Sequence, residues 1–133
     1  MPSNAWQPER KEQRASDILQ AIRTIRNYVS GISHEAFLQE TMRQDAVARQ
    51  LLIVAEACDK IPEIERKLEI LEADSLESRY SKIPWRAIRN MGIRIRHIYG
   101  KENANVLWDT ATSNDLNDLQ EALLTEYPFM RDE

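Results

Sequence analysis

His97 lies in a stretch of the chain that is rich in arginine and free of acidic residues. Between residues 79 and 101 there are seven Lys and Arg residues but no Asp or Glu. A local surplus of cations attracts phosphate groups, and an imidazole titrates near neutral pH. The pattern therefore predicts a phosphate-binding surface with a titratable group on it. The seven cations are Arg79, Lys82, Arg86, Arg89, Arg94, Arg96 and Lys101.

The rest of the chain is strongly acidic, which sets the basic stretch apart. The 133 residues include 18 Lys and Arg against 22 Asp and Glu, so 11 cations face 22 acids outside residues 79–101. The acidic segment from Glu63 to Glu77 offers an alternative, because its carboxylates could neutralise the basic residues within the molecule. Composition alone leaves a phosphate-binding surface and a neutralised one both open.

Apolar residues that recur every three or four positions predict that helices position these side chains. The sequence has only three glycines, no internal repeat and no linker. We therefore expect one domain, residues 1–133, folded as an all-α antiparallel up-and-down bundle of four to five main helices, with residues 1–13 as a flexible extension. The expected helices run from Ile18 to Val29, ending at Gly31; from Ser33 to Ile61-Pro62; through Ile64, Leu68 and Leu71; from Pro84 to Tyr99, ending at Gly100; from Val106 to Ala111; and from Leu116 to Leu124.

The basic stretch is expected to follow one face of the helix that starts at Pro84. At about 100° per residue, Ile88, Gly92, Ile95 and Tyr99 point toward the core. The opposite face presents Arg86, Asn90, Ile93 and His97, with Arg89 and Arg94 on its two shoulders and Arg96 nearer the core edge. An isoleucine amid these polar groups indicates that a second copy of the chain covers part of the face.

Other candidate residues give weaker signals. Glu56 stands in an apolar helix, and we interpret it as a buried partner of an arginine rather than as a positioned base. Cys58 is the only cysteine, which rules out a disulfide within the chain, and two histidines with one cysteine are too few for a structural zinc site. No segment is apolar enough for a signal peptide or a membrane span. The sequence thus predicts a cytoplasmic protein without a metal or other cofactor.

Seven short motifs resemble a known family in their order and spacing. They are Asp17-Ile18-Leu19, Tyr28-Val29-Ser30-Gly31, Leu52-Ile53-Val54-Ala55-Glu56-Ala57, Ile83-Pro84-Trp85, His97-Ile98-Tyr99, Trp108 and Asp115-Leu116. The set resembles the HepT-like proteins of the HEPN superfamily, from about residue 14 to 125. The resemblance implies a homodimeric helical bundle. It also implies a metal-independent endoribonuclease that acts on RNA at a cleft across the dimer, as the toxin of a bacterial toxin–antitoxin pair whose antitoxin is a nucleotidyltransferase.

The active motif of that family is Arg, four residues, His, one residue, Tyr, frequently with Asn after the Arg. His97 and Tyr99 match it, whereas Gly92 and Ile93 stand where Arg and Asn are expected. Some family members have an arginine directly before the histidine, as Arg96 is here. Arg94 is another possible substitute, because a position three residues before His97 is a neighbour on a helix. The resemblance further implies that the partner nucleotidyltransferase attaches AMP to Tyr99.

Metal-free RNA cleavage needs a base to remove the 2′-hydroxyl proton and a donor to stabilise charge on phosphorus, and it leaves a 2′,3′-cyclic phosphate. The candidate catalytic residues are therefore His97, Arg96 and Arg94, and the candidate RNA or phosphate ligands are Arg86, Arg89 and Asn90. An alternative is a weakly active or inactive dimeric module that binds a nucleotide or docks a nucleotidyltransferase. A structural helical dimer without a ligand is a third possibility.

Overall fold

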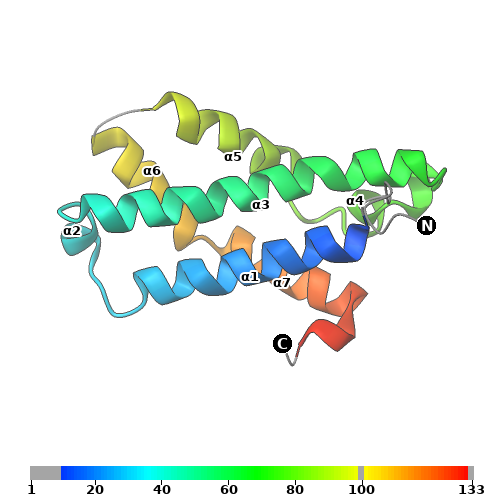
Figure 1. Ribbon diagram of the computed structural model, residues 1–133, viewed down its shortest axis with the longest axis horizontal. Coiled ribbons are helices and arrows are strands. Elements are labelled where there is room, and N and C mark those ends of the chain that lie inside the picture. Colours follow the sequence, from blue (N-terminus) through cyan, green and yellow to red (C-terminus); the bar gives the residue numbers. More distant parts are fainter. Residues whose placement is uncertain (1–9, 99–100, 132–133) are drawn as a thin grey trace, which may run out of the picture.

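Helices form almost all of the molecule (Figure 1). The computed structural model describes residues 10–98 and 101–131, apart from the side chains of residues 101 and 102. Five helices are long: α1 (Lys11–Val29), α3 (Thr41–Lys67), α5 (Trp85–His97), α6 (Lys101–Ala111) and α7 (Asn114–Glu126). Four are short: α2 (His34–Phe37), η1 (Glu72–Asp74), α4 (Leu76–Arg79) and η2 (Pro128–Met130). No strand occurs in the described part of the chain, so the predicted all-α bundle is confirmed.

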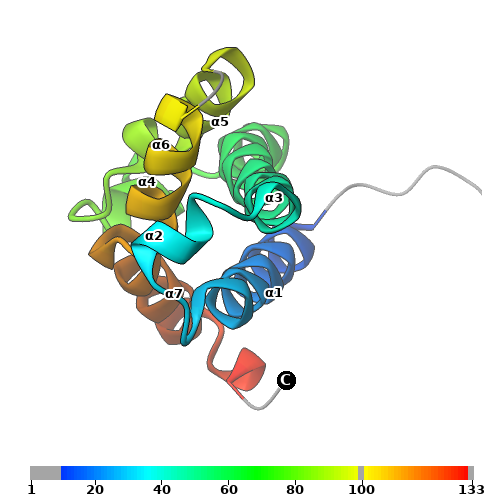
Figure 2. The same cartoon turned by 90° about the vertical axis from the view of Figure 1, so that its left-hand side faces the viewer.

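The long helices α1 and α3 run antiparallel and form the centre of the bundle (Figure 1). In the view along the bundle, α5 and α6 lie beside α3, and α7 lies beside α1 (Figure 2). The core between them is built from fully buried aliphatic side chains such as Ile22, Leu51 and Leu123. Burial of each such side chain contributes about 1.5 to 3 kcal/mol, which makes this packing the main source of stability.

The connection between α1 and α3 differs from the predicted one. Gly31 has a φ of 75°, in the left-handed region that favours glycine, and it ends α1 as predicted. The Ser33 hydroxyl accepts a hydrogen bond from the Ala36 N–H at 3.0 Å, but the helix that it caps, α2, ends at Phe37. The continuous helix predicted from Ser33 to Pro62 is therefore wrong, since α3 starts afresh at Thr41.

The predicted end of the second long helix at Pro62 is also wrong, because α3 continues to Lys67. A proline inside a helix costs one backbone hydrogen bond, so neighbouring contacts must hold the last turns in place. Ile64 is buried, and the Glu65 carboxylate, only 3% exposed, accepts hydrogen bonds from Lys11 Nζ at 2.9 Å and from the Leu76 N–H at 2.8 Å. The buried carboxylate thus ties α3 to the starts of α1 and α4.

The helix predicted around Ile64, Leu68 and Leu71 does not form. Ile64 belongs to α3, whereas Leu68 and Leu71 are 56% and 71% exposed in the loop that follows. At the N-terminus, α1 begins at Lys11, so residues 11–13 of the predicted flexible extension are helical. Residues 1–9 lie outside the described residues.

Helix α3 contains two candidate residues from the sequence, Glu56 and Cys58. Glu56 is exposed, so its interpretation as a buried partner of an arginine is wrong, and Glu65 is the buried carboxylate of this helix. Cys58 is buried, and burial raises the pKa of its thiol to about 12. A thiol of that pKa stays protonated at neutral pH, which fits a packing role. Within the described residues, no helix has the length and apolar character needed to span a membrane.

Candidate active site

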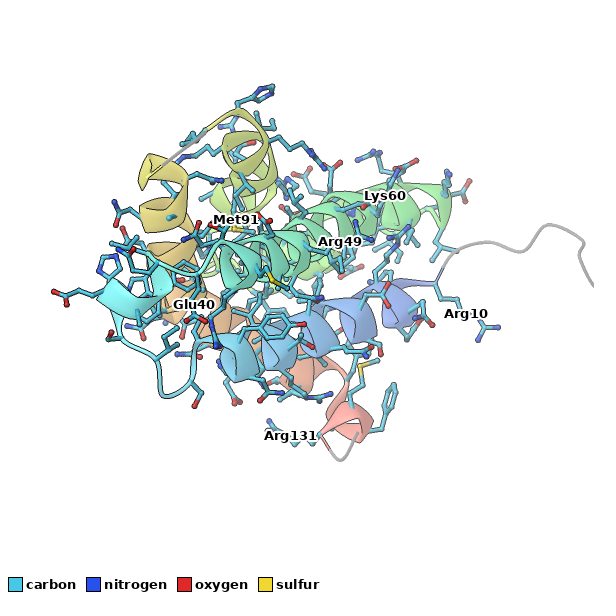
Figure 3. All side chains as sticks on the ribbon, turned by 60° about the vertical axis from the view of Figure 1, so that its left-hand side comes forward. Arg10, Glu40, Arg49, Lys60, Met91 and Arg131 are labelled. Atoms are coloured by element: carbon cyan, nitrogen blue, oxygen red, sulfur yellow. The ribbon has the colours of Figure 1, made fainter. Side chains whose placement is uncertain are left out.

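Helix α5 separates an apolar inner face from a polar outer one. Trp85, Ile88, Met91, Gly92 and Ile95 are buried against the rest of the bundle, and Figure 3 shows Met91 on this inner side. The indole N–H of Trp85 donates to the Tyr80 carbonyl oxygen at 3.0 Å and fixes the start of the helix. The exposed residues are Arg86, Ala87, Asn90, Ile93, Arg94, Arg96 and His97, which include the outward face Arg86, Asn90, Ile93 and His97 that the spacing predicts.

His97 is the last residue of α5. The predicted helix runs on to Tyr99, but Ile98 is already extended, with φ −104° and ψ 132°. The His97 imidazole is exposed and has no hydrogen-bond or ion-pair partner among the described side chains. It is therefore free to meet a ligand.

The second histidine, His34, has a structural environment. Its Nε2 lies 2.9 Å from Asn105 Oδ1, and its ring stacks on Trp108 with the ring centres 5.3 Å apart and an angle of 4° between the planes. Trp108 also packs against the buried Phe37. His34 therefore joins α2 to α6, whereas His97 makes no such contact with the residues that the structure describes.

Two arginines of the basic stretch are neutralised within the molecule. Arg79 forms a two-pronged ion pair with Glu126 of α7, with N–O distances of 2.6 and 2.5 Å, and the Tyr80 hydroxyl donates to the same carboxylate at 3.1 Å. The hydrogen bonds from Arg79 hold the pKa of Glu126 below its usual range. Arg89 pairs with Glu77 of α4 at 2.6 Å. Arg89, a predicted phosphate ligand, thus already holds an anionic partner in the free protein.

The other arginines of α5 have no ion-pair partner among the described residues, and they point to different sides. No described carboxylate lies within 4.0 Å of the Arg86, Arg94 or Arg96 guanidinium. Arg86 and Asn90 line an open pocket of about 600 Å³ at the start of α5, together with the paired Arg89 and Glu77. Arg94 lines a separate groove of about 210 Å³ between α5 and the α6–α7 pair, together with Asp109 and Asp115. Two carboxylates near Arg94 make that groove less attractive to phosphate.

The Arg96 guanidinium lies on the α3 side of α5, next to Gly92. A Cβ atom built on Gly92 would lie 3.8 Å from Arg96 Nη1, 3.8 Å from Leu52 Cδ2 and 3.1 Å from Ala55 Cβ. The Arg96 side chain thus reaches back one helical turn, along the edge where α5 meets α3. The structure therefore places a guanidinium beside position 92, although position 92 itself has no side chain.

Arg49, an exposed cation near this edge, is not among the candidates predicted from the sequence. Arg49 of α3 is exposed and labelled in Figure 3, and it lies three residues before Leu52, which contacts the Gly92 side of α5. Residues three apart are neighbours on a helix, so Arg49 extends the basic surface from α5 onto α3. No signal in the sequence points to Arg49, because only the packing of α3 against α5 brings it there.

Comparisons with known proteins decide the family. The family model described as Ribonuclease HepT-like matches residues 18–125, most of the chain. This chain belongs to the HepT-like ribonuclease family. It is 33% identical to "Probable ribonuclease HepT" of Thermococcus cleftensis over 71% of this chain and 76% of that protein. It is 25% identical to a candidate RNase of Methanocaldococcus jannaschii over 79% of this chain and 78% of that protein. No solved structure matches the chain.

As a HepT-like chain, this protein departs from the family motif within α5. Gly92 is buried against α3 and Ile93 is exposed, at the two positions where the motif has Arg and Asn. His97 keeps its place at the end of the helix. Tyr99 lies outside the described residues, so its assignment as the AMP acceptor remains a prediction.

Proposed function

We propose that this HepT-like protein is a metal-independent endoribonuclease in which His97 is the base and Arg96 stabilises the charge on phosphorus. The exposed, unpaired His97 at the end of α5 carries the proposal. The unpaired Arg96 guanidinium beside Gly92 supplies the second group that the reaction requires. Membership of a ribonuclease family and the surplus of cations on the outer face of α5 support an RNA substrate.

The reaction follows from these two groups. The neutral His97 imidazole removes the proton of a ribose 2′-hydroxyl, and the resulting oxygen attacks the adjacent phosphorus. A bond from O2′ to phosphorus forms as the bond from phosphorus to O5′ breaks, which leaves a 2′,3′-cyclic phosphate and a 5′-hydroxyl that takes up the proton. The planar Arg96 guanidinium donates to the non-bridging oxygens as negative charge grows on them. A general base such as His97 typically raises the rate by a factor of about 10² to 10⁴.

Of the two candidate arginines, Arg96 has surroundings better suited than those of Arg94 to stabilise the charge on phosphorus. Arg94 shares its groove with Asp109 and Asp115, whose charges repel a phosphate. Arg86, Asn90 and Arg49 then serve as contacts to the RNA backbone. Arg89 joins them only if phosphate replaces Glu77 as its partner.

The family resemblance extends the proposal to partners. By that resemblance the protein is a homodimer, and in this proposal two copies of α5 face each other and cover Ile93, which is 56% exposed in the middle of the basic face. In this proposal the protein is the cytoplasmic toxin of a toxin–antitoxin pair. A nucleotidyltransferase antitoxin blocks it by attaching AMP to Tyr99.

The test is incubation of the purified protein with a labelled RNA in excess EDTA, which removes divalent metals. The wild type is expected to give products with 2′,3′-cyclic phosphate ends, and His97→Ala to cleave at least about 100-fold more slowly. Arg10→Ala is the control for the loss of one exposed polar side chain elsewhere on the surface. Arg10 precedes α1, beside the end of α3 that Lys11 contacts, and lies away from the end of α5 (Figure 3). Equal cleavage by wild type and His97→Ala contradicts the proposal.

A second candidate function rests on Gly92. Without an arginine in its motif position, the chain could act as an inactive dimeric module that binds a nucleotide or docks a nucleotidyltransferase. That function predicts intact RNA with a folded wild-type protein, both with Mg²⁺ and in EDTA. It also predicts a stable complex with a nucleotidyltransferase encoded by the neighbouring gene, measured by size-exclusion chromatography.

A further inference from the structure

Three aromatic rings meet where α2 packs against α6, and one of them is open to solvent. Phe37 is fully buried, and its ring centre lies 5.3 Å from that of the half-buried Trp108. The ring of the exposed His34 lies parallel to Trp108, with the ring centres 5.3 Å apart and the planes at 4°. Exposure therefore increases from Phe37 through Trp108 to His34.

The His34 ring is held in one orientation although the packing of α2 depends little on it. The buried Phe37 already holds α2 against Trp108, and an exposed ring removes little further apolar surface from water. His34 Nε2 lies 2.9 Å from Asn105 Oδ1, and because an amide oxygen only accepts, Nε2 donates this hydrogen bond. Trp108 covers one face of the ring, so the other face of this exposed residue is presented to solvent.

This ring lies near the candidate catalytic histidine. The end of α5, the start of α6 and α2 lie toward the same end of the bundle (Figure 1). Helix α6 begins at Lys101, so even a fully extended connection leaves the Cα atoms of His97 and Asn105 no more than about 20 Å apart. A few nucleotides of extended single strand cover such a span.

The chemistry of this surface fits an uncharged base better than a phosphate. Proteins bind single-stranded RNA by combining cations along the backbone with exposed aromatic rings on which bases stack. The outer face of α5 supplies cations such as Arg86 and Arg96. Beside the His34 ring, the next residue, Glu35, is exposed and anionic, which disfavours a phosphate there.

We propose that the outer face of His34, backed by Trp108, is a stacking platform for one nucleobase of a single-stranded RNA whose backbone reaches His97. The inference rests on the proposed ribonuclease function and adds a binding subsite to it. Since every base has a flat π-face, the platform accepts any of the four bases.

An abasic scan tests this inference with the His97→Ala protein, in which binding is measured without cleavage. Short labelled RNAs that span a cleavage site mapped with the wild type each lack one base, at successive positions, and keep an intact backbone. We expect one position, or two adjacent ones, to weaken binding by about five- to 100-fold, because a stacked base is lost.

Two substitutions separate the ring of His34 from its hydrogen bond. His34→Gln keeps an N–H donor for Asn105 but removes the ring, whereas His34→Phe keeps a ring but removes the donor. With His34→Gln, the sensitive abasic RNA should bind within about twofold of the intact RNA, since no ring is left to lose its base. With His34→Phe, the abasic penalty should stay within about threefold of that of the parent protein. Thermal melts of each variant set an assay temperature at which all are folded.

Cleavage kinetics provide a second measurement in the protein with His97 intact. His34→Gln should raise KM at least about fivefold and change kcat by less than about threefold, because the platform binds the RNA and does not touch the reacting atoms. Abasic penalties that are equal with and without the His34 ring overturn the inference and leave the ribonuclease function in place. A folded wild type that neither binds nor cleaves RNA overturns both.

Discussion

The two ends of the basic stretch are both rich in cations but have different surroundings. Around α4 and the start of α5, Arg79 and Arg89 are bound by Glu126 and Glu77. In the last turn of α5, Arg96 and His97 are exposed and have no described partner. The first region joins helices within the molecule, whereas the cations of the second have no carboxylate partner among the described residues.

This difference shows that a surplus of cations along the sequence is no measure of free charge on the surface. Glu77 lies just before the stretch and Glu126 lies far beyond it, yet both reach into it through the fold. Neutralisation by the acidic segment from Glu63 to Glu77 is therefore found for Arg89, which pairs with Glu77, whereas phosphate binding by the basic stretch stays a prediction. A phosphate-binding function must rest on the cations of α5 that have no described carboxylate partner, which are Arg86, Arg94 and Arg96.

The largest expected difference between the two regions is in the rate of RNA cleavage after one arginine in each is replaced. Arg96→Ala is expected to lower the rate of RNA cleavage by about 10² to 10³, because it removes the donor to the phosphorus oxygens. It should hardly change the melting temperature, since Arg96 is exposed and unpaired. Arg89→Ala should cost up to about 1 kcal/mol of stability with a loss of rate below about tenfold. Cleavage rates and thermal melts of both variants are the measurement, and a larger loss of rate with Arg89→Ala contradicts the division.

Salt dependence gives a finer test of which cations are free. Arg86 belongs to the start of α5 but is exposed and has no described carboxylate partner, so it groups with the free cations. For the catalytically impaired His97→Ala protein, we expect Arg86→Ala to reduce the slope of log affinity against log salt by about 0.7 for single-stranded RNA. Arg79→Ala should leave the slope unchanged, because Glu126 already neutralises that cation. The affinities are measured by fluorescence anisotropy. Equal slopes for the two variants would show that Arg86 does not contact the RNA.

The fold class and the faces of α5 could be predicted because they depend on local periodicity. The spacing of Ile88, Gly92 and Ile95 was enough to point His97 outward. The helix ends at Phe37 and Lys67 could not be predicted, because they depend on side-chain contacts that the spacing of apolar residues does not reveal. The Gln44 side chain donates to the Phe37 carbonyl oxygen, and Glu65 anchors the last turns of α3 to Lys11 and Leu76.

The candidate site was predictable as a set of residues but not as an arrangement. Sequence spacing left Arg94 and Arg96 equivalent, because both are close to His97 along the helix. Tertiary packing distinguishes them, since α6 and α7 bring Asp109 and Asp115 to Arg94 while α3 meets α5 beside Arg96. The pairing of Arg89 with Glu77 and the nearby position of Arg49 depend on the same packing.

The smallest expected effect concerns the structural end of the basic stretch and its dependence on pH. The pKa of Glu126 is lowered in the folded protein, chiefly by the hydrogen bonds from Arg79. A carboxyl whose folded pKa is depressed adds stability that is fully present above its unfolded pKa of about 4.3 and is lost as pH falls through the folded pKa. Glu126→Gln should therefore cost about 0.5 to 1 kcal/mol near pH 7 and have less effect at pH 3, as measured by urea unfolding. RNA cleavage near pH 7 should stay within about twofold of the wild type, because Glu126 acts on Arg79 and not on the end of α5. An equal cost at both pH values would show that the Arg79–Glu126 ion pair adds nothing to stability and that this region is not the structural half of the stretch.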